Sequence, residues 1–103
     1  MVKFIALYSK PEDPKAFDDR YLNGHIPLAA KIPGLRRMEL SRIKGSPGGE
    51  PRYYLMAELY FNSHEALNAG LKSEQGKAVG KDVMSFAGKL VHMMVADVES
   101  PAT

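Results

Sequence analysis

The chain has 103 residues, of which 45% are apolar and 25% are charged, and its formal net charge is +2. These values are typical of a single globular domain, here residues 1–103, and so small a charge gives no reason to expect nucleic acid as a partner. The sequence has no cysteine, which excludes disulfides, thiolate nucleophiles and cysteine-based metal sites.

Apolar runs are short throughout the sequence. None of them approaches the ~20 residues that a membrane-spanning helix needs, and we expect no membrane partner. The apolar stretch near the N-terminus is too short for the core of a signal sequence. A cytoplasmic protein is therefore the expectation.

The first half of the chain predicts a strand, a long helix and a second strand. Residues 2–9 are rich in strand formers, and the prolines of KPEDP stop that strand. Asp13 is suited to cap a helix that begins at Pro14 and continues to about residue 31, before a Pro-Gly pair. Residues 35–44 alternate as a strand does, and their basic side chains are more typical of a solvated strand edge than of a polyanion site.

The second half predicts a hairpin, two helices and a closing strand: residues 45–51 form the turn, and residues 52–61, 62–71, 73–86 and 89–99 form the elements. In NSHE (62–65), Asn62 is the expected helix cap and Glu65 its capping-box partner. Ser73 is suited to cap the second helix. We find no repeat and no domain boundary.

This β-α-β-β-α-β order predicts an α+β, ferredoxin-like domain with both helical segments on one face of a four-stranded antiparallel sheet. The other face would ordinarily be polar. The first and last strands are instead apolar on both faces, as the run Val91, Met93 and Val95 beside Leu90 and Met94 shows. An open apolar face predicts a partner, most economically a second copy packed sheet to sheet in a homodimer; the alternative is a monomer with an apolar surface.

A histidine and a proline interrupt the long helix in NGHIP (23–27). At ~100° per residue, one apolar arc about 140° wide contains the following side chains: Phe17, Tyr21, Leu22, His25, Leu28, Ala29 and Ile32. The ring of His25 should therefore point at the sheet. Pro27 leaves the carbonyl of Asn23 without a helical donor and should bend or split the helix, which leaves room for a cavity. The alternative is a core histidine hydrogen-bonded at an ordinary kink.

The spacing F-x3-Y-x3-H-x-P-L, followed by PGL (33–35), resembles the EthD family, named after a small protein encoded with a cytochrome P450 system that degrades ethyl tert-butyl ether. The likeness extends over the whole chain. It implies a subunit of a dimeric α+β barrel. Relatives in the wider superfamily include cofactor-free enzymes that act on rings, among them isomerases, dehydratases and quinol-forming monooxygenases.

With this resemblance, His25 and Tyr21 become the candidate catalytic residues. Free imidazole titrates near ~6.5 and can move a proton at neutral pH, while the tyrosine one turn away could hold a ligand oxygen. The candidate substrate-binding residues are Tyr8, Phe17, Leu28 and His92. Tyr8 and His92 depend on the sheet face that they occupy, and a strand histidine is more often structural. His64, in a capping turn, is expected in solvent.

Other site types have little support in the sequence. The three histidines lack the spacing of a metal site, so neither a metal nor another cofactor is expected. The six methionines fill irregular core gaps or suit a flat apolar ligand. An RNA-recognition module of the same topology would need a glycine-bearing motif that strand 52–61 lacks, and Glu58 would repel phosphate. Metallochaperones need a cysteine pair, and a haem-degrading relative would be expected to offer a tryptophan; the chain has neither.

Two functions remain open. In the first, the protein is a cofactor-independent isomerase, dehydratase or monooxygenase acting on a ring or enolisable substrate, and His25 moves the proton. In the second, the same pocket only binds a small apolar or aromatic ligand, as a carrier or accessory protein of an oxygenase system. Only the enzyme would lose its chemistry, with binding retained, when His25 is replaced by Gln.

Overall fold

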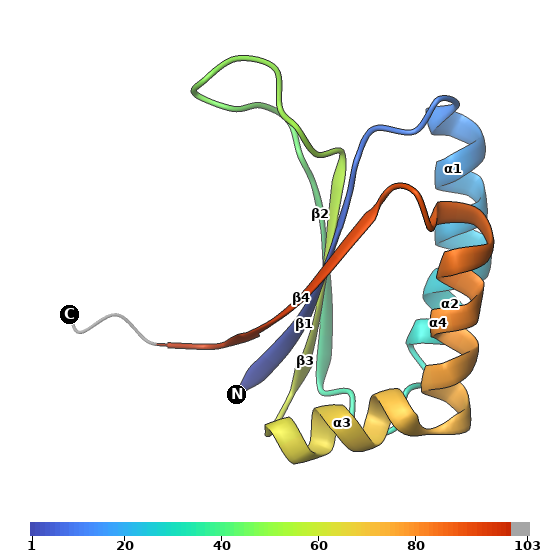
Figure 1. The fold of residues 1–103 in the computed structure, drawn as a ribbon, viewed down its shortest axis with the longest axis vertical. Helices are drawn as coiled ribbons and strands as arrows, with labels where there is room; N and C mark the ends of the chain where they lie inside the picture. Colours follow the sequence, from blue (N-terminus) through green and yellow to red (C-terminus); the bar gives the residue numbers. More distant parts are fainter. Residues whose placement is uncertain (100–103) are drawn as a thin grey trace.

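The computed structural model describes residues 1–99, which form a single layer of helices on a single sheet (Figure 1). In chain order the elements are β1 (Val2–Tyr8), α1 (Pro14–Arg20), the π-helical turn η1 (Tyr21–His25), α2 (Ile26–Ala29), β2 (Arg37–Arg42), β3 (Leu55–Phe61), α3 (His64–Lys72), α4 (Glu74–Ala87) and β4 (Val91–Asp97). All strand pairs are antiparallel, in the order β2-β3-β1-β4. The predicted α+β, ferredoxin-like fold is confirmed.

The helix boundaries follow from side-chain caps. Asp13 accepts a hydrogen bond from the amide of Ala16, and Pro14 occupies the first helical turn, as predicted. Ser73 caps α4 through the amide of Gly76, also as predicted. For α3 the prediction was one residue off: Ser63, and not Asn62, accepts from the Ala66 amide. Both residue types cap well, so the sequence alone did not separate them.

The hairpin between β2 and β3 is wider than predicted. The strands cover residues 37–42 and 55–61, so residues 43–54 form a long connection that projects beyond the sheet, on the side away from the helices (Figure 1). A single isolated bridge, Ser46 to Gly49, closes its tip. Its glycines and prolines cannot sustain a regular ladder, which explains the shorter strands.

Strand register decides which side chains face the helices. Phe4 lies opposite Leu59 and Val95, and Tyr8 lies opposite Leu55 and Val91, all on the helix side. The intervening residues therefore lie on the open face of the sheet: they are Lys3, Ile5 and Leu7 on β1, Met56, Glu58 and Tyr60 on β3, and His92, Met94 and Ala96 on β4. On β1 and β4 this face is mainly apolar, as predicted, but β2 adds the polar side chains of Arg37, Glu39 and Ser41. At its centre the ammonium of Lys3 contacts the carboxylate of Glu58 (2.5 Å).

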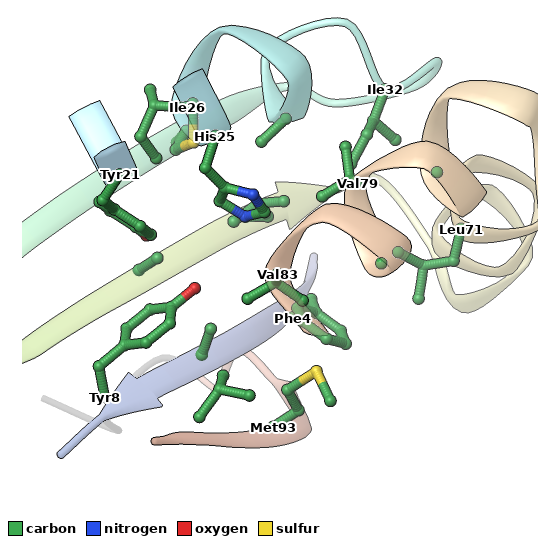
Figure 2. A pocket seen from close by; sticks show the side chains of 18 residues that line it. Phe4, Tyr8, Tyr21, His25, Ile26, Ile32, Leu71, Val79, Val83 and Met93 are labelled. Carbon is green, nitrogen blue, oxygen red and sulfur yellow. The ribbon is translucent and has the colours of Figure 1, made fainter. Parts of the chain in front are cut away.

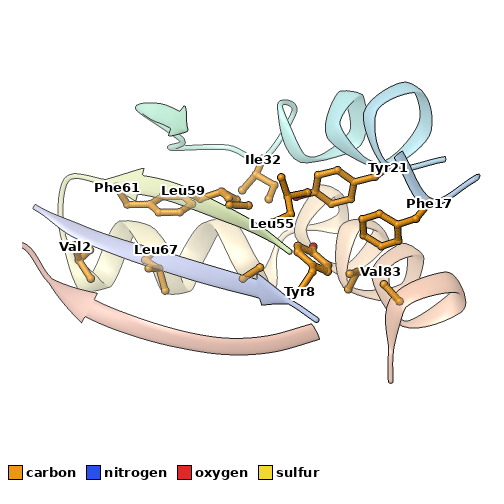
Figure 3. Packing of buried hydrophobic residues seen from close by; sticks show 13 residues of the cluster. Val2, Tyr8, Phe17, Tyr21, Ile32, Leu55, Leu59, Phe61, Leu67 and Val83 are labelled. Carbon is orange, nitrogen blue, oxygen red and sulfur yellow. The ribbon is translucent and has the colours of Figure 1, made fainter. Parts of the chain in front are cut away.

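The core fills the space between sheet and helices (Figure 3). At one end, aromatic rings interlock: Tyr8 lies edge-on to Phe17 and Tyr21, with ring centroids 5.6 Å and 5.0 Å apart. Each such side chain contributes about 1.5–3 kcal/mol when buried. None of the helices formed by residues 1–99 is long and apolar enough to cross a membrane.

Candidate functional site

The interruption in the first long helix is a π-helical turn. The amide of Ile26 donates to the carbonyl of Tyr21, five residues back, and Pro27, which has no amide hydrogen, follows directly. In an α-helix, residues four apart are separated by ~400°, which is ~40° more than a full turn, so side chains at every fourth position gradually rotate away from the sheet. The π-helical turn has more residues per turn and compensates for this rotation. The residues that stay buried against the sheet are Phe17, Tyr21, His25 and Ala29.

The same turn corrects one member of the predicted apolar arc. Leu22 is 44% exposed, because the wider turn rotates it away from the sheet. The predicted break at Pro27 is confirmed, and its form explains why an ionisable ring and a helix breaker stand together. The backbone opens at η1 so that the ring of His25 can stay on the inner side.

An aspartate on α4 holds that ring. Nδ1 of His25 lies 2.8 Å from Oδ2 of Asp82, 57 residues further along the chain. A carboxylate can only accept, so Nδ1 carries the hydrogen and the lone pair of a neutral ring is on Nε2. None of the side-chain hydrogen bonds within residues 1–99 uses Nε2, and since no fully buried side-chain nitrogen or oxygen there lacks a partner, Nε2 is open to the cavity. It is therefore available to a ligand.

Asp82 is itself held by Arg20. The guanidinium contacts both carboxylate oxygens, at 2.5 Å and 3.3 Å, and lies over the ring of Phe86, 4.4 Å from its centre. Arg20 and, to a smaller extent, His25 hold the pKa of Asp82 below its usual range, while partial burial opposes them. The carboxylate stays ionised at neutral pH and fixes the orientation of the imidazole.

A cavity of about 80 Å³ lies against the His25 ring, between the helices and the sheet (Figure 2). Its walls come from all four strands, η1, α2, α3 and α4 and are mainly apolar: they include Phe4, Ile26, Ile32, Leu59, Leu71, Val79, Val83 and Met93. Three lining side chains carry a nitrogen or oxygen: Tyr8, Tyr21 and His25. The arrangement is an apolar site with a few convergent polar groups, as is usual for small-molecule pockets.

The two tyrosines are neutral hydrogen-bond donors. Burial raises the pKa of Tyr21 far above its usual range, and the neighbouring Tyr8 raises it further. Burial also raises the pKa of Tyr8, with Tyr21 opposing the shift. The hydroxyl of Tyr8 points into the same space as the imidazole (Figure 2), and the ring of Tyr21 stacks on that of His25 with centroids 5.4 Å apart. Neither phenol can serve as a base at neutral pH.

The structure brings together three of the six predicted site residues: Tyr8, Tyr21 and His25 line the cavity. Phe17 packs behind the two tyrosines as part of the core and does not line the cavity. Leu28 is half-buried and also lies outside the lining.

His92 is a clear correction, because it lies on the open face opposite Leu7, edge-on to Tyr53. Since neighbouring strand residues alternate between faces, it cannot share a cavity with His25.

Sequence reasoning missed Asp82 and Arg20. Arg20 lies in the turn before Tyr21, and Asp82 begins the DVMSFA segment of α4. The one indication in the sequence was that each residue is adjacent to a residue on the inner face of its helix. Only the packing of α4 beside η1 brings the two charges together. Among residues 1–99, no group of three or more His, Asp or Glu side chains is placed to hold a metal ion.

The sequence matches the EthD domain over residues 9–89. It is 54% identical to an ethyl tert-butyl ether degradation (EthD) family protein from Bacillus halodurans; the crystal structure of that protein superposes with a TM-score of 0.93, over 96% of this chain and 99% of the other. It is 33% identical, over 97% of both chains, to an uncharacterized 11.0 kDa protein in the thcB-thcC intergenic region of Rhodococcus erythropolis.

Two more distant structures share the fold. A mutant of SnoaB, a cofactor-independent oxygenase from Streptomyces nogalater, has a TM-score of 0.70 at 14% identity, over 98% of this chain and 95% of the other. A dimeric ferredoxin-like protein of unknown function from Jannaschia sp. CCS1 has a TM-score of 0.67 at 16% identity, over 95% and 100%. At these identities the likeness concerns the fold alone.

Proposed function

The chain belongs to the EthD family, and on this premise we propose that it is a small cofactor-independent enzyme that moves a proton on an apolar ring or enolisable substrate. The observation that carries the proposal is the His25–Asp82 pair at the wall of an apolar cavity, with Nε2 of the imidazole left without a partner. A histidine oriented by a carboxylate, with its second nitrogen free, is the usual arrangement of a general base.

The proposed proton transfer uses the groups at the cavity wall. Nε2 of His25 takes a proton from a carbon next to a carbonyl, or from a ring hydroxyl, and the electron pair of the broken bond moves onto the substrate oxygen. Asp82 stabilises the imidazolium that forms. The hydroxyl of Tyr21 donates to that of Tyr8, which leaves the hydrogen of Tyr8 for the developing oxyanion, and the apolar walls strengthen both interactions by excluding water.

The first step is common to three reactions. Return of the proton to another carbon gives an isomerisation, and its transfer to a departing hydroxyl gives a dehydration. Reaction of the enolate or phenolate with dioxygen gives a hydroperoxide on the substrate carbon, and loss of water from it leaves a new carbonyl, which is a monooxygenation. SnoaB, with the same fold, is an oxygenase that needs no cofactor, which supports placing this chemistry on a ferredoxin-like scaffold.

A homodimer completes the proposal. The open face of the sheet presents Ile5, Leu7, Met56 and Met94, and a protein of similar fold from Jannaschia is dimeric. Packing two such faces together would remove the apolar surface from water and form an α+β barrel. The buried pair of Lys3 and Glu58 would then need a polar group of the partner, or each other, inside the interface.

The alternative function is binding without chemistry, as an accessory protein that presents an apolar compound to an oxygenase. The predominance of aliphatic side chains in the cavity wall favours it, since binding alone needs no oriented base. It would leave the ion pair that holds His25 without a role in function.

The deciding experiment begins with a thermal-shift screen of lactones, quinols, anthrone-like polycycles and branched ethers. Compounds that bind are then incubated in D₂O and examined by mass spectrometry for proton exchange and turnover. His25→Gln should keep binding but lose exchange and turnover. His92→Gln makes the same substitution on the other face of the sheet and should keep both. Equal turnover in wild type and His25→Gln would contradict the proposed enzymatic role of His25. Binding without proton exchange in wild type and in both variants would favour the alternative function.

A further inference from the structure

The cavity is poorly covered on its β4 side. On β1 and β3 most side chains that face the helices are buried, whereas their neighbours Met93 and Val95 on β4 are 50% and 48% exposed. β4 is an edge strand of the sheet. Met93 nevertheless lines the cavity, so this side chain separates the cavity from solvent.

Gly80 on α4 is a second exposed residue of the cavity wall. It lines the internal cavity and also an open groove along the outer side of α4. A Cβ atom at this position would have no neighbour within 4 Å, so a side chain here would extend into open space. Glycine inside a helix is unfavourable, and here no close approach of another atom requires it. The absence of a side chain at Gly80 is consistent with an opening between the groove and the cavity, which a larger residue would close.

The groove outside the opening is positively charged. Lys77 and Lys81 lie one turn apart and flank Gly80, and neither forms an ion pair within residues 1–99. Glu74 lies in the same groove and offsets one of the two charges. The remaining wall is apolar, from Ala78 and the exposed side chain of Met84. An apolar floor with a net positive rim is complementary to an amphiphilic anion.

The size of the cavity indicates how the ligand uses this groove. At about 80 Å³ the cavity is well below the ~300 Å³ at the small end of ligand sites. We propose that the ligand enters between Gly80 and Met93 and is an elongated or flat apolar anion, a carboxylate or sulfonate. Its apolar end reaches His25, and its charged end remains in the groove beside Lys77 and Lys81. The inference rests on the proposed function only in taking the cavity as the ligand site.

Two fluorescent probes that differ by one charged group test this proposal. They are 1-anilinonaphthalene-8-sulfonate and N-phenyl-1-naphthylamine, which lacks the sulfonate. Gly80→Leu should weaken both by at least tenfold and raise the melting temperature by a few degrees, because leucine favours the helix more than glycine. A loss of binding in a more stable protein cannot be ascribed to unfolding. Gln75→Leu, exposed on α4 outside cavity and groove, should leave both probes unaffected.

The charged end is tested separately. Lys77→Gln combined with Lys81→Gln should weaken the sulfonate about three- to tenfold, more at low salt, and leave the neutral probe unchanged. Lys72→Gln with Lys89→Gln removes the same charge away from the groove and should change neither.

Three results would overturn the inference. If both probes bind Gly80→Leu as tightly as wild type, the opening lies elsewhere, and the exchange assay on His25→Gln still tests the proposed enzymatic function. If replacing Lys77 and Lys81 weakens both probes equally, the ligand is not an anion held by these lysines. Failure of both probes to bind the wild type overturns the proposed entry and the anionic ligand class, and the exchange assay on His25→Gln tests the enzyme separately.

Discussion

Two histidine–aspartate pairs join distant parts of this molecule. Nδ1 of His25 lies 2.8 Å from Asp82, and Nε2 of His64 lies 2.5 Å from Asp97. In the first pair the side chains are 6% and 16% exposed; in the second they are 60% and 70% exposed. The first bridges η1 and α4 beside the cavity, and the second bridges the start of α3 and the end of β4.

The contrast shows that chemistry of this kind depends on surroundings more than on residue type. At the surface, water screens the pair and competes for both nitrogens, so such contacts contribute about 0–1 kcal/mol. Inside, the carboxylate fixes the ring, a guanidinium fixes the carboxylate, and the second ring nitrogen faces an apolar space. The sequence expectation that His64 would be solvated is confirmed.

The largest expected difference between the two pairs is in turnover. Asp82→Asn should lower the rate on a substrate found in the screen by about 10²–10⁴-fold, because the amide no longer holds the required tautomer or stabilises the imidazolium. Asp97→Asn should change it by less than about twofold. Initial rates at saturating substrate measure both effects. Equal losses of rate would contradict the conclusion that only the His25–Asp82 pair takes part in catalysis.

The next difference is in the free energy of unfolding. His25→Ala should lose about 2–4 kcal/mol, since it enlarges an existing cavity and removes a buried partner of Asp82. His64→Ala should lose less than about 1 kcal/mol, as expected for an exposed ion pair. Urea unfolding at pH 7 gives both values. If His64→Ala proved the more costly, the burial argument would be wrong.

Acid should separate the pairs further. The pKa of Asp82 is lower in the folded protein than in the unfolded chain. Its contribution to stability is therefore complete above the unfolded pKa of ~3.9 and is lost as the pH falls through the folded value. Asp82→Asn should be less stable than wild type at pH 6 and should lose less stability between pH 5 and 2. Urea unfolding across this range tests it, with Asp97→Asn as the control.

The smallest expected effect concerns the guanidinium. A Cβ at Gly24 would lie 2.7 Å from Nη1 of Arg20, so Gly24→Ala should push Arg20 from Asp82. The side chain is flexible and the helix gains from alanine, so the net change in unfolding free energy should stay within about 1 kcal/mol. The pKa of Asp82 should rise, which titration by carbon-13 NMR would show. An unchanged pKa would mean that Arg20 keeps its contact.

Much of the fold was predictable because it depends on local signals. Asp13, Pro14 and Ser73 mark helix ends wherever they occur, and alternation marks strands. The inward direction of His25 was also predictable, from its four-residue spacing to Tyr21. The only sequence indication of the π-helical turn that preserves this direction was Pro27 in the interior of a predicted helix.

The sequence by itself determined the order of the elements, the helical stripe that carries His25 and the membership of the EthD family. Only the tertiary structure decided that Tyr8 lies under the helices while His92 lies on the opposite face, because shifting a strand by one residue exchanges its faces. It also decided that Asp82 holds His25. That contact spans 57 residues and exists only when α4 packs beside η1, a geometry that no local pattern encodes.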